Sequence, residues 1–243
     1  TKEAKSGVST AICSQIKNYL INEDLENAVN FPLQDSSELK GISSFLDLAD
    51  NLGIIHRNIS EGPIRSVEIN CFGTLDQIKP ISLSFLRSLL QNRVPERVNF
   101  INAETIAKEL GIELSINYST SNSNYSNLIS ARVIAKNDII FEGSVFNDDL
   151  PRLVNLMGYK MEVNLKGTLL FIQNDDVPGV VGKVGTILGK NKINIGAYLL
   201  SQHSREKLAF AVIRLDSPID EKLIGELQNV DEVKFVNQIQ INS

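Results

Sequence analysis

Residues 167–197 constrain the fold of this 243-residue chain more than any other segment, because three secondary-structure signals follow one another there. An apolar run at 169–172 ends in a polar turn at 174–179, and apolar residues then recur at a helical period. That period predicts a helix with one buried face and with Pro178 in its first turn, where a missing N–H costs nothing. Gly182 and Gly185 share a helix face and predict a close backbone neighbour. The positions expected to be buried are Val180, Val181, Val184, Ile187 and Leu188.

A strand at 193–201, entered through Asn194, is expected to follow this helix. Residues 208–215 predict another strand, joined to it by a hairpin at 204–207. Ser217 suits a helix cap with Pro218 in the first turn, and Leu223, Ile224 and Leu227 would form the buried stripe of that helix. Val233, Phe235, Ile239 and Ile241 recur at period two and predict a last strand. The order is βαββαβ, a ferredoxin-like unit. We expect its polar turn and Asn194 to lie side by side and to hold a small polar molecule.

The preceding residues predict a second α+β unit. Its helices are expected at 42–55 and 81–90, with a third ending at Gly111, a suitable C-cap. Its strands are expected at 64–72, 112–118, 128–135, 139–146 and 152–156. The polar stretch 119–127 predicts a loop. We therefore divide the chain into a helix and linker at 1–32, a mixed α/β domain at 33–165 and the ferredoxin-like domain at 166–243.

Several ordered motifs resemble known families. Residues 174–195, NDDVPGVVGKVGTILGKNKINI, resemble the ACT domain, a regulatory module that binds amino acids in metabolic enzymes. Their sequence is similar to the C-terminal end of D-3-phosphoglycerate dehydrogenases. Residues 61–68, 97–103 and 107–112 resemble the intervening domain of the long, type I form of that family, and 27–32 the segment that leaves its nucleotide-binding domain. The similarity covers nearly the whole chain.

This resemblance implies candidate binding residues. ACT domains of this family hold L-serine with the loop after the first strand and the asparagine that opens the second, which here nominates Asn174, Asp176 and Asn194. The chemistry suits a zwitterion, since Asp176 could accept from its ammonium and the helix N-terminus could donate to its carboxylate. The intervening domain of the family can hold an anionic phosphate effector, for which Arg152 and Lys160 are the candidates.

The resemblance also implies what this stretch lacks. No G-x-G-x-x-G follows an expected strand, so the dinucleotide fingerprint is absent. The two histidines, His56 and His203, do not sit in the family's catalytic motifs; His56 is expected to be structural or exposed and His203 to face solvent. The chain begins with Thr1, and its first 20 residues suggest the last helix of a preceding domain. We expect no catalytic residue, no metal and no cofactor in this chain, and NAD only in a full-length enzyme.

Composition excludes several function classes. The net charge of −5 and the absence of a basic stripe argue against a nucleic-acid partner. No apolar run approaches the roughly 20 residues of a membrane span, and two cysteines form no disulfide framework. We expect a cytoplasmic protein that assembles as a homodimer or homotetramer.

Three interpretations stay open. Serine binding between paired ACT domains would regulate the enzyme. Val177, where the family usually has a basic residue, and Asn174, often aromatic or histidine, keep open a pure oligomerisation scaffold. The iron–sulfur L-serine dehydratases have a related intervening domain, but their cysteine ligands are missing here.

Overall fold

The computed structural model describes residues 2–22, 36–75, 77–120, 125–146, 149–203 and 206–241. The chain divides into two compact units, Thr1–Ser43 and Ser44–Ser243. The first unit contains α1 (Lys2–Asn22) and the start of α2 (Ser36–Ile59). Helix α1 confirms the helix expected over the first 20 residues. The apolar stripe of α1 is exposed at Val8, Ile12, Ile16 and Leu20. The motif at 27–32 lies outside the described residues.

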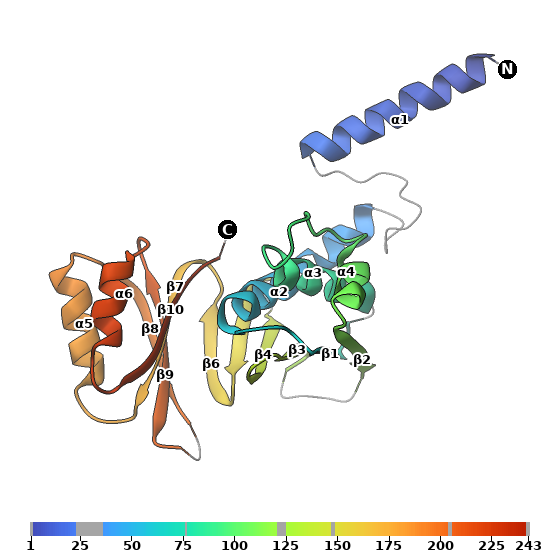
Figure 1. Ribbon diagram of the computed structural model, residues 1–243. Coiled ribbons are helices and arrows are strands. Elements are labelled where there is room, and N and C mark those ends of the chain that lie inside the picture. Colours follow the sequence, from blue (N-terminus) through green and yellow to red (C-terminus); the bar gives the residue numbers. More distant parts are fainter. Residues whose placement is uncertain are drawn as a thin grey trace. The chain divides into compact units, whose positions relative to one another are not determined.

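The second unit begins with a six-stranded sheet of order β2-β1-β3-β4-β5-β6 (Figure 1). Only β1 and β2 pair in parallel, and every other neighbouring pair is antiparallel. The strands are β1 (Ser66–Gly73), β2 (Glu113–Ser119), β3 (Asn127–Ile134), β4 (Asp138–Val145), β5 (Pro151–Leu156) and β6 (Tyr159–Asn164). The helices are α2, α3 (Ile78–Leu90) and α4 (Ala103–Glu109).

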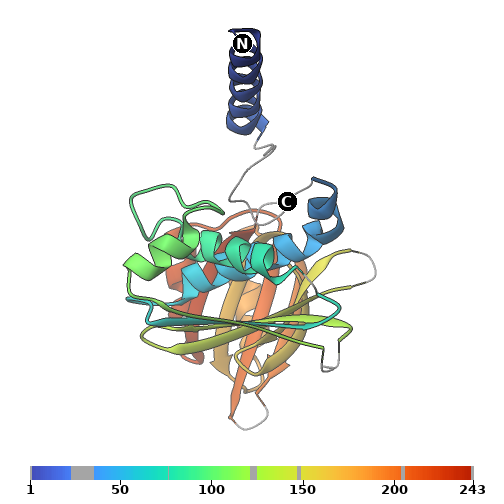
Figure 2. The ribbon, with the colours of Figure 1, turned by 90° about the vertical axis from the view of Figure 1, so that its right-hand side faces the viewer.

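Helices cover one face of this sheet, as Figure 2 shows. Alternate residues of β1, Val67, Ile69 and Cys71, are buried on that face and belong to one apolar cluster with Leu52 of α2 and Phe85 of α3. Their neighbours in the sequence point to the opposite face, which is polar. The period-two alternation that predicted the strands therefore also sorts their side chains between core and solvent.

Strand β6 was not predicted, although Tyr159, Met161 and Val163 alternate as a strand requires. It forms a hairpin with β5 through Met157 and Gly158, which both have positive φ, at 51° and 92°. Two-residue hairpin turns need such angles, and a methionine at the first position does not signal one. The sheet consequently continues to Asn164, eight residues beyond the expected last strand.

The remaining residues form a four-stranded sheet of order β10-β7-β9-β8 with two helices, which confirms the ferredoxin-like βαββαβ order and the α+β class. Strand β7 is antiparallel to both β9 and β10, and β8 is antiparallel to β9. The elements are β7 (Gly167–Asp175), α5 (Val180–Lys190), β8 (Ile195–Gln202), β9 (Leu208–Leu215), α6 (Glu221–Gln228) and β10 (Val233–Ile241).

Helix α5 differs from its prediction in three respects. Gly179 is the N-cap, with φ of 100°, so Pro178 lies before the helix rather than in its first turn. Val181 is 46% exposed, and the buried stripe consists of Val180, Val184 and Leu188. A Cβ placed on Gly182 or Gly185 would meet no atom of the described chain within 4 Å, so the expected close neighbour is not found in this chain.

The cap of α6 and the faces of β10 also differ from the prediction. Asp220, not Ser217, caps α6, and its side chain accepts from the backbone N–H of Leu223 at 2.8 Å. A bulge between Val233 and Phe235 breaks the period of β10. Val233 therefore packs toward the helices, whereas Phe235 contacts the core on the other side of the sheet.

The two sheets share one hydrophobic core. The face of the four-stranded sheet away from α5 and α6, which we call the helix-free face, contacts β6 of the six-stranded sheet. The core residues that β6 and the segment after it contribute are Tyr159, Met161, Val163 and Leu165. Those of the helix-free face are Leu169, Phe171, Phe210, Val212, Ile239 and Ile241. Asn237 of β10 also donates to the backbone oxygen of Asn58 in α2, at 3.1 Å.

No helix in the described ranges is long and apolar enough to cross a membrane.

Candidate functional site

The loop between β7 and α5, residues 176–179, is an exposed turn directly before the N-terminus of α5. Three backbone bonds hold it in place, from Asp175 N to Glu232 O at 2.8 Å, from Asp176 N to Lys207 O at 3.0 Å and from Val177 N to Asp175 O at 3.0 Å. Gly179 adopts a left-handed conformation that favours glycine, and α5 starts directly after it. The first N–H groups of α5 have no partner within the helix, so this loop can receive an anionic group.

Asn174 is the last buried side chain of β7, one residue before the strand ends at Asp175, and it is 4% exposed. It alternates with Leu170 and Ile172, which pack toward α5 and α6. Its amide nitrogen donates to the backbone oxygen of Asp175 at 2.7 Å. The side chain is therefore already engaged in fixing the loop, and its oxygen is the atom that remains for another donor.

Asp176 is exposed on the loop. The ion pairs of the described residues at this end of the sheet join Lys234 to Asp175 at 2.8 Å and Lys183 to Glu232 at 2.5 Å, and Asp176 takes part in neither. The Lys183 ammonium lowers the pKa of the Glu232 carboxyl by hydrogen bonding. The Asp176 carboxylate is thus accessible to solvent near the α5 N-terminus, and it could accept a hydrogen bond from the ammonium group of a zwitterion.

Asn194 lies at the opposite end of the same sheet, contrary to the expectation that it lies beside the loop. Asn174 pairs with Ala209 at the start of β9, whereas Ile195 pairs with Leu215 at its end. Six residues of β9 separate the two positions, which corresponds to roughly 20 Å. Helix α5 returns the chain to the end where β7 began, and so β8 starts there. Asn194 is exposed. Its backbone N–H donates to the Asp216 carboxylate at 3.3 Å, and its backbone oxygen accepts from the Asp216 N–H at 3.3 Å.

Arg152 and Lys160, the expected phosphate-binding pair, are not brought together. Arg152 pairs with Asn164 in the β5–β6 ladder, so it lies about four β6 residues, or roughly 13 Å, from Lys160. Its guanidinium lies 4.5 Å from the centre of the Phe146 ring and 4.0 Å from the carboxylate of Glu162. Lys160 is exposed.

A groove of about 540 Å³ lies between α5 and residues 229–231, which follow α6, and contains none of the predicted binding residues. Its walls include Gly182, Lys183 and Asp231. A smaller cavity of about 260 Å³ is lined by Leu90, Arg93 and Ile112. Arg93 donates there to the carbonyl oxygens of Arg57, Ser60 and Gly62. Its positive charge therefore stabilises the C-terminal end of α2.

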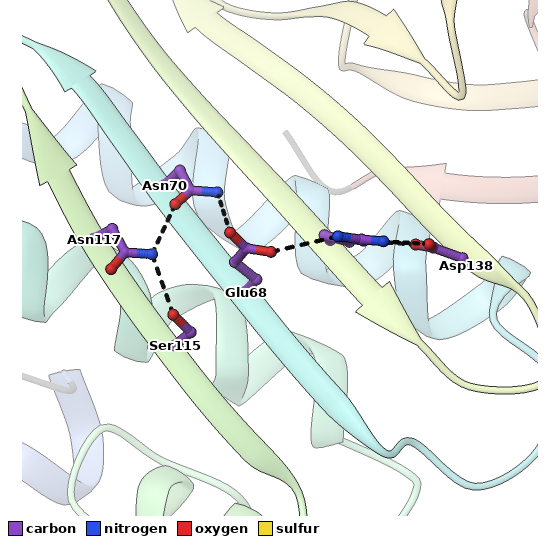
Figure 3. A network of polar contacts seen from close by, with 6 residues as sticks. Glu68, Asn70, Ser115, Asn117 and Asp138 are labelled. Atoms are coloured by element: carbon purple, nitrogen blue, oxygen red, sulfur yellow. Dashed lines mark hydrogen bonds and ion pairs between the residues drawn. The ribbon is translucent and has the colours of Figure 1, made fainter. Parts of the chain in front are cut away.

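The open face of the six-stranded sheet carries a polar network that the sequence did not indicate (Figure 3). Arg132 bonds Asp138 at 2.8 Å and lies 3.7 Å from Glu68, which accepts from Asn70 at 3.0 Å. The bonds to Asp138 raise the pKa of Arg132 and lower that of the Asp138 carboxyl. Asn117 continues the network to Asn70 at 2.9 Å. These groups are exposed, and such pairs contribute little to stability.

His56 and Cys71 are both fully buried. Burial lowers the pKa of His56 to about 3, with Arg93 adding to the effect, and raises that of the Cys71 thiol to about 12. His56 is thus a structural core residue. His203 was expected to face solvent, but it is half-buried and packs against Tyr159, with ring centres 5.1 Å apart. Among the described residues, no cluster of three or more His, Cys, Asp or Glu side chains could hold a metal ion.

Comparisons with known proteins point in one direction. Residues 41–157 match the family model of the D-3-phosphoglycerate dehydrogenase intervening domain. The chain is 28% identical over 244 residues to D-3-phosphoglycerate dehydrogenase of Bacillus subtilis (strain 168), covering 99% of this chain and 46% of the relative. It is 29% identical over 246 residues to the same enzyme of Methanocaldococcus jannaschii, again covering 99% and 46%. The chain therefore spans about half the length of these relatives.

A solved structure, the ACT domain from GTP pyrophosphokinase of Chlorobium tepidum, aligns with 30% of this chain and 97% of its own, at 16% identity and a TM-score of 0.26. The order of the four-stranded sheet, rather than this alignment, establishes the fold of residues 167–241.

Proposed function

We propose, from the premise that this chain is homologous to the regulatory part of D-3-phosphoglycerate dehydrogenase, that it binds L-serine and controls that enzyme by feedback. The whole enzyme would oxidise 3-phosphoglycerate with NAD, the first step of L-serine biosynthesis, in the cytoplasm. In this account the residues described here bind the effector and join subunits, and the reaction takes place elsewhere in the protein.

The observation that carries this proposal is the exposed Asp176 carboxylate beside the N-terminus of α5. The carboxylate accepts from the serine ammonium, while the first N–H groups of α5 donate to the serine carboxylate. The Asn174 oxygen is the further acceptor at the base of the loop. One small site thereby offers the opposite charges that a zwitterionic amino acid needs.

Asn194 would complete this site only from a second copy of the chain. Strand β8 is the edge of the four-stranded sheet, so its outer backbone groups can pair with another strand. If two β8 strands pair antiparallel about a two-fold axis, Asn194 of a second copy comes to the end of the sheet that carries Asp176. The proposed effector site is then built between subunits, which joins serine binding to oligomerisation.

Subunit mixing tests this arrangement. Asp176→Ala and Asn194→Ala should each abolish L-serine binding in a pure homodimer. After equal amounts are unfolded and refolded together, half of the dimers are mixed, and each mixed dimer has one site with both residues intact. About one quarter of the original sites should therefore reappear, measured by calorimetry. No recovery in mixed dimers would contradict a shared site, and full binding by either variant alone would contradict the assigned residues.

A second candidate function is an oligomerisation scaffold without an effector. The inward position of Asn174 favours it, because the amide of this residue is bonded to the Asp175 backbone. Val177, 46% exposed, likewise supplies no charge to the loop. A folded dimer that shows no heat of binding with millimolar L-serine would support the scaffold and exclude the effector site.

A further inference from the structure

We propose that Tyr159 of the six-stranded sheet positions the effector loop, so that L-serine binding and the contact between the two sheets strengthen each other. This inference rests on the proposed function, because it specifies how occupancy of the same site reaches the intervening domain. Tyr159 touches no ligand in this account. It acts through two sets of contacts that lead to Asn174 and Asp176.

The first set runs along β7. The amide of Gln173 donates to the Tyr159 hydroxyl at 3.2 Å. Gln173 directly precedes Asn174, and successive residues of a strand point to opposite faces. Gln173 therefore lies on the helix-free face, toward β6, whereas Asn174 lies on the opposite face, toward α5 and α6. A shift of the last residues of β7 moves both side chains together.

The second set runs through His203, directly after β8, and through Glu206 and Lys207, directly before β9. The Tyr159 ring lies 5.1 Å from the His203 ring and 5.4 Å from the Phe210 ring, centre to centre. His203 Nδ1 accepts from the backbone N–H of Glu206 at 3.1 Å. The next residue, Lys207, accepts from the backbone N–H of Asp176 at 3.0 Å. Both sets of contacts thus begin at Tyr159 and end at the loop.

Tyr159 is held firmly enough to act as a reference point. It is 2% exposed and lies in the core that the two sheets share. Gly158 before it has φ of 92°, and a Cβ there would lie 3.3 Å from His203 Nε2. The β5–β6 turn therefore fits closely against His203, directly after β8. Because the packing is tight, displacement of the loop requires rearrangement at this junction.

Thermodynamic linkage between L-serine binding and the contacts of Tyr159 has a measurable consequence. If the junction favours the binding-competent loop, then L-serine must favour the intact junction by the same factor. Ligand binding should consequently slow amide exchange in β5 and β6, although the ligand contacts neither strand.

Tyr159→Phe removes only the hydroxyl and tests the first set of contacts. We expect about fivefold weaker L-serine binding, the effect of one neutral hydrogen bond, and loss of the serine-induced slowing of exchange in residues 151–164. Gln173→Met should weaken binding by a similar factor. The double variant should bind no more weakly than either single variant, since both remove one interaction. Calorimetry and hydrogen–deuterium exchange on the whole chain provide the two readouts.

Tyr118→Phe is the matched control, because it removes a tyrosine hydroxyl bonded to Gly73 O at 2.8 Å, on the edge strand β2. It should leave serine affinity and exchange in β6 unchanged. Unchanged affinity in Tyr159→Phe, additive losses in the double variant, or serine binding without slower exchange in β6 would each overturn the positioning role alone. Absence of serine binding by the unmodified chain would overturn the proposed function, and this inference with it.

Discussion

At the residue scale, His56 shows how burial determines chemistry. Its ring is fully buried, with centres 4.4 Å from Phe141 and 5.5 Å from Phe85, and its Nε2 lies 3.1 Å from Ala131 O. The pKa of about 3, against an ordinary 6.5, arises first from desolvation of the charged ring. In the folded protein His56 is therefore neutral at pH values where the unfolded chain is protonated.

This difference predicts an acid dependence of stability. The contribution of His56 is fully present above about pH 6.5, and it is lost as pH falls toward 3, at up to about 1.4 kcal/mol per unit. His56→Leu removes the titration, so its free energy of unfolding should fall less steeply between pH 6.5 and 4. Urea denaturation at several pH values measures the slope. Identical slopes in both proteins would show that His56 does not cause the acid sensitivity.

At the element scale, the cap of α6 gives a direct test of the observed helix start. Asp220→Ala removes the acceptor of the Leu223 N–H and should destabilise the protein by about 1 kcal/mol. Ser217→Ala is the control, since the one hydrogen bond of its hydroxyl within the described part of the chain is an exposed bond to Asp216, at 3.3 Å. Chemical denaturation compares the two variants. A larger loss for Ser217→Ala would restore the cap expected from the sequence.

Most elements could be predicted because their apolar residues have a clear period. Strand β6 was missed because its turn, Met157 and Gly158, carries no sequence signal at the first residue, although the alternation from Tyr159 onward was readable. The bulge in β10 could not be predicted, since it depends on pairing with β7. The separation of Asn194 from the loop, in contrast, follows from topology alone: a helix that connects two parallel strands returns the chain to its starting end.

The residues of the candidate site could be named only through the family resemblance. Asp176 on an exposed loop and Asn194 at a strand start also fit an ordinary cap and an ordinary strand entry. The network around Arg132 and the Tyr159–Gln173 bond join residues distant in the sequence, so no local pattern indicates them.

At the scale of the whole molecule, the shared core between the two sheets predicts that residues 44–241 unfold together. Phe171 is fully buried in that core, and Phe171→Ala should cost about 3–5 kcal/mol. Because β6 packs on the same core, calorimetric heating should still show one transition for this unit, at a lower temperature. Ile101→Ala, which truncates a side chain that is 45% exposed and lies outside β8, is the control and should change little. Two separate transitions would indicate that the sheets are independent.

We propose that this molecule is an L-serine sensor. The most direct measurement is calorimetric titration of L-serine into the unmodified chain and into Asp176→Ala and Asn194→Ala, with glycine and D-serine as reference ligands. We predict saturable binding of about one L-serine per chain, weaker binding of the reference ligands, and loss of binding in both variants. A folded dimer with no response to millimolar L-serine would contradict the claim and leave the oligomerisation scaffold.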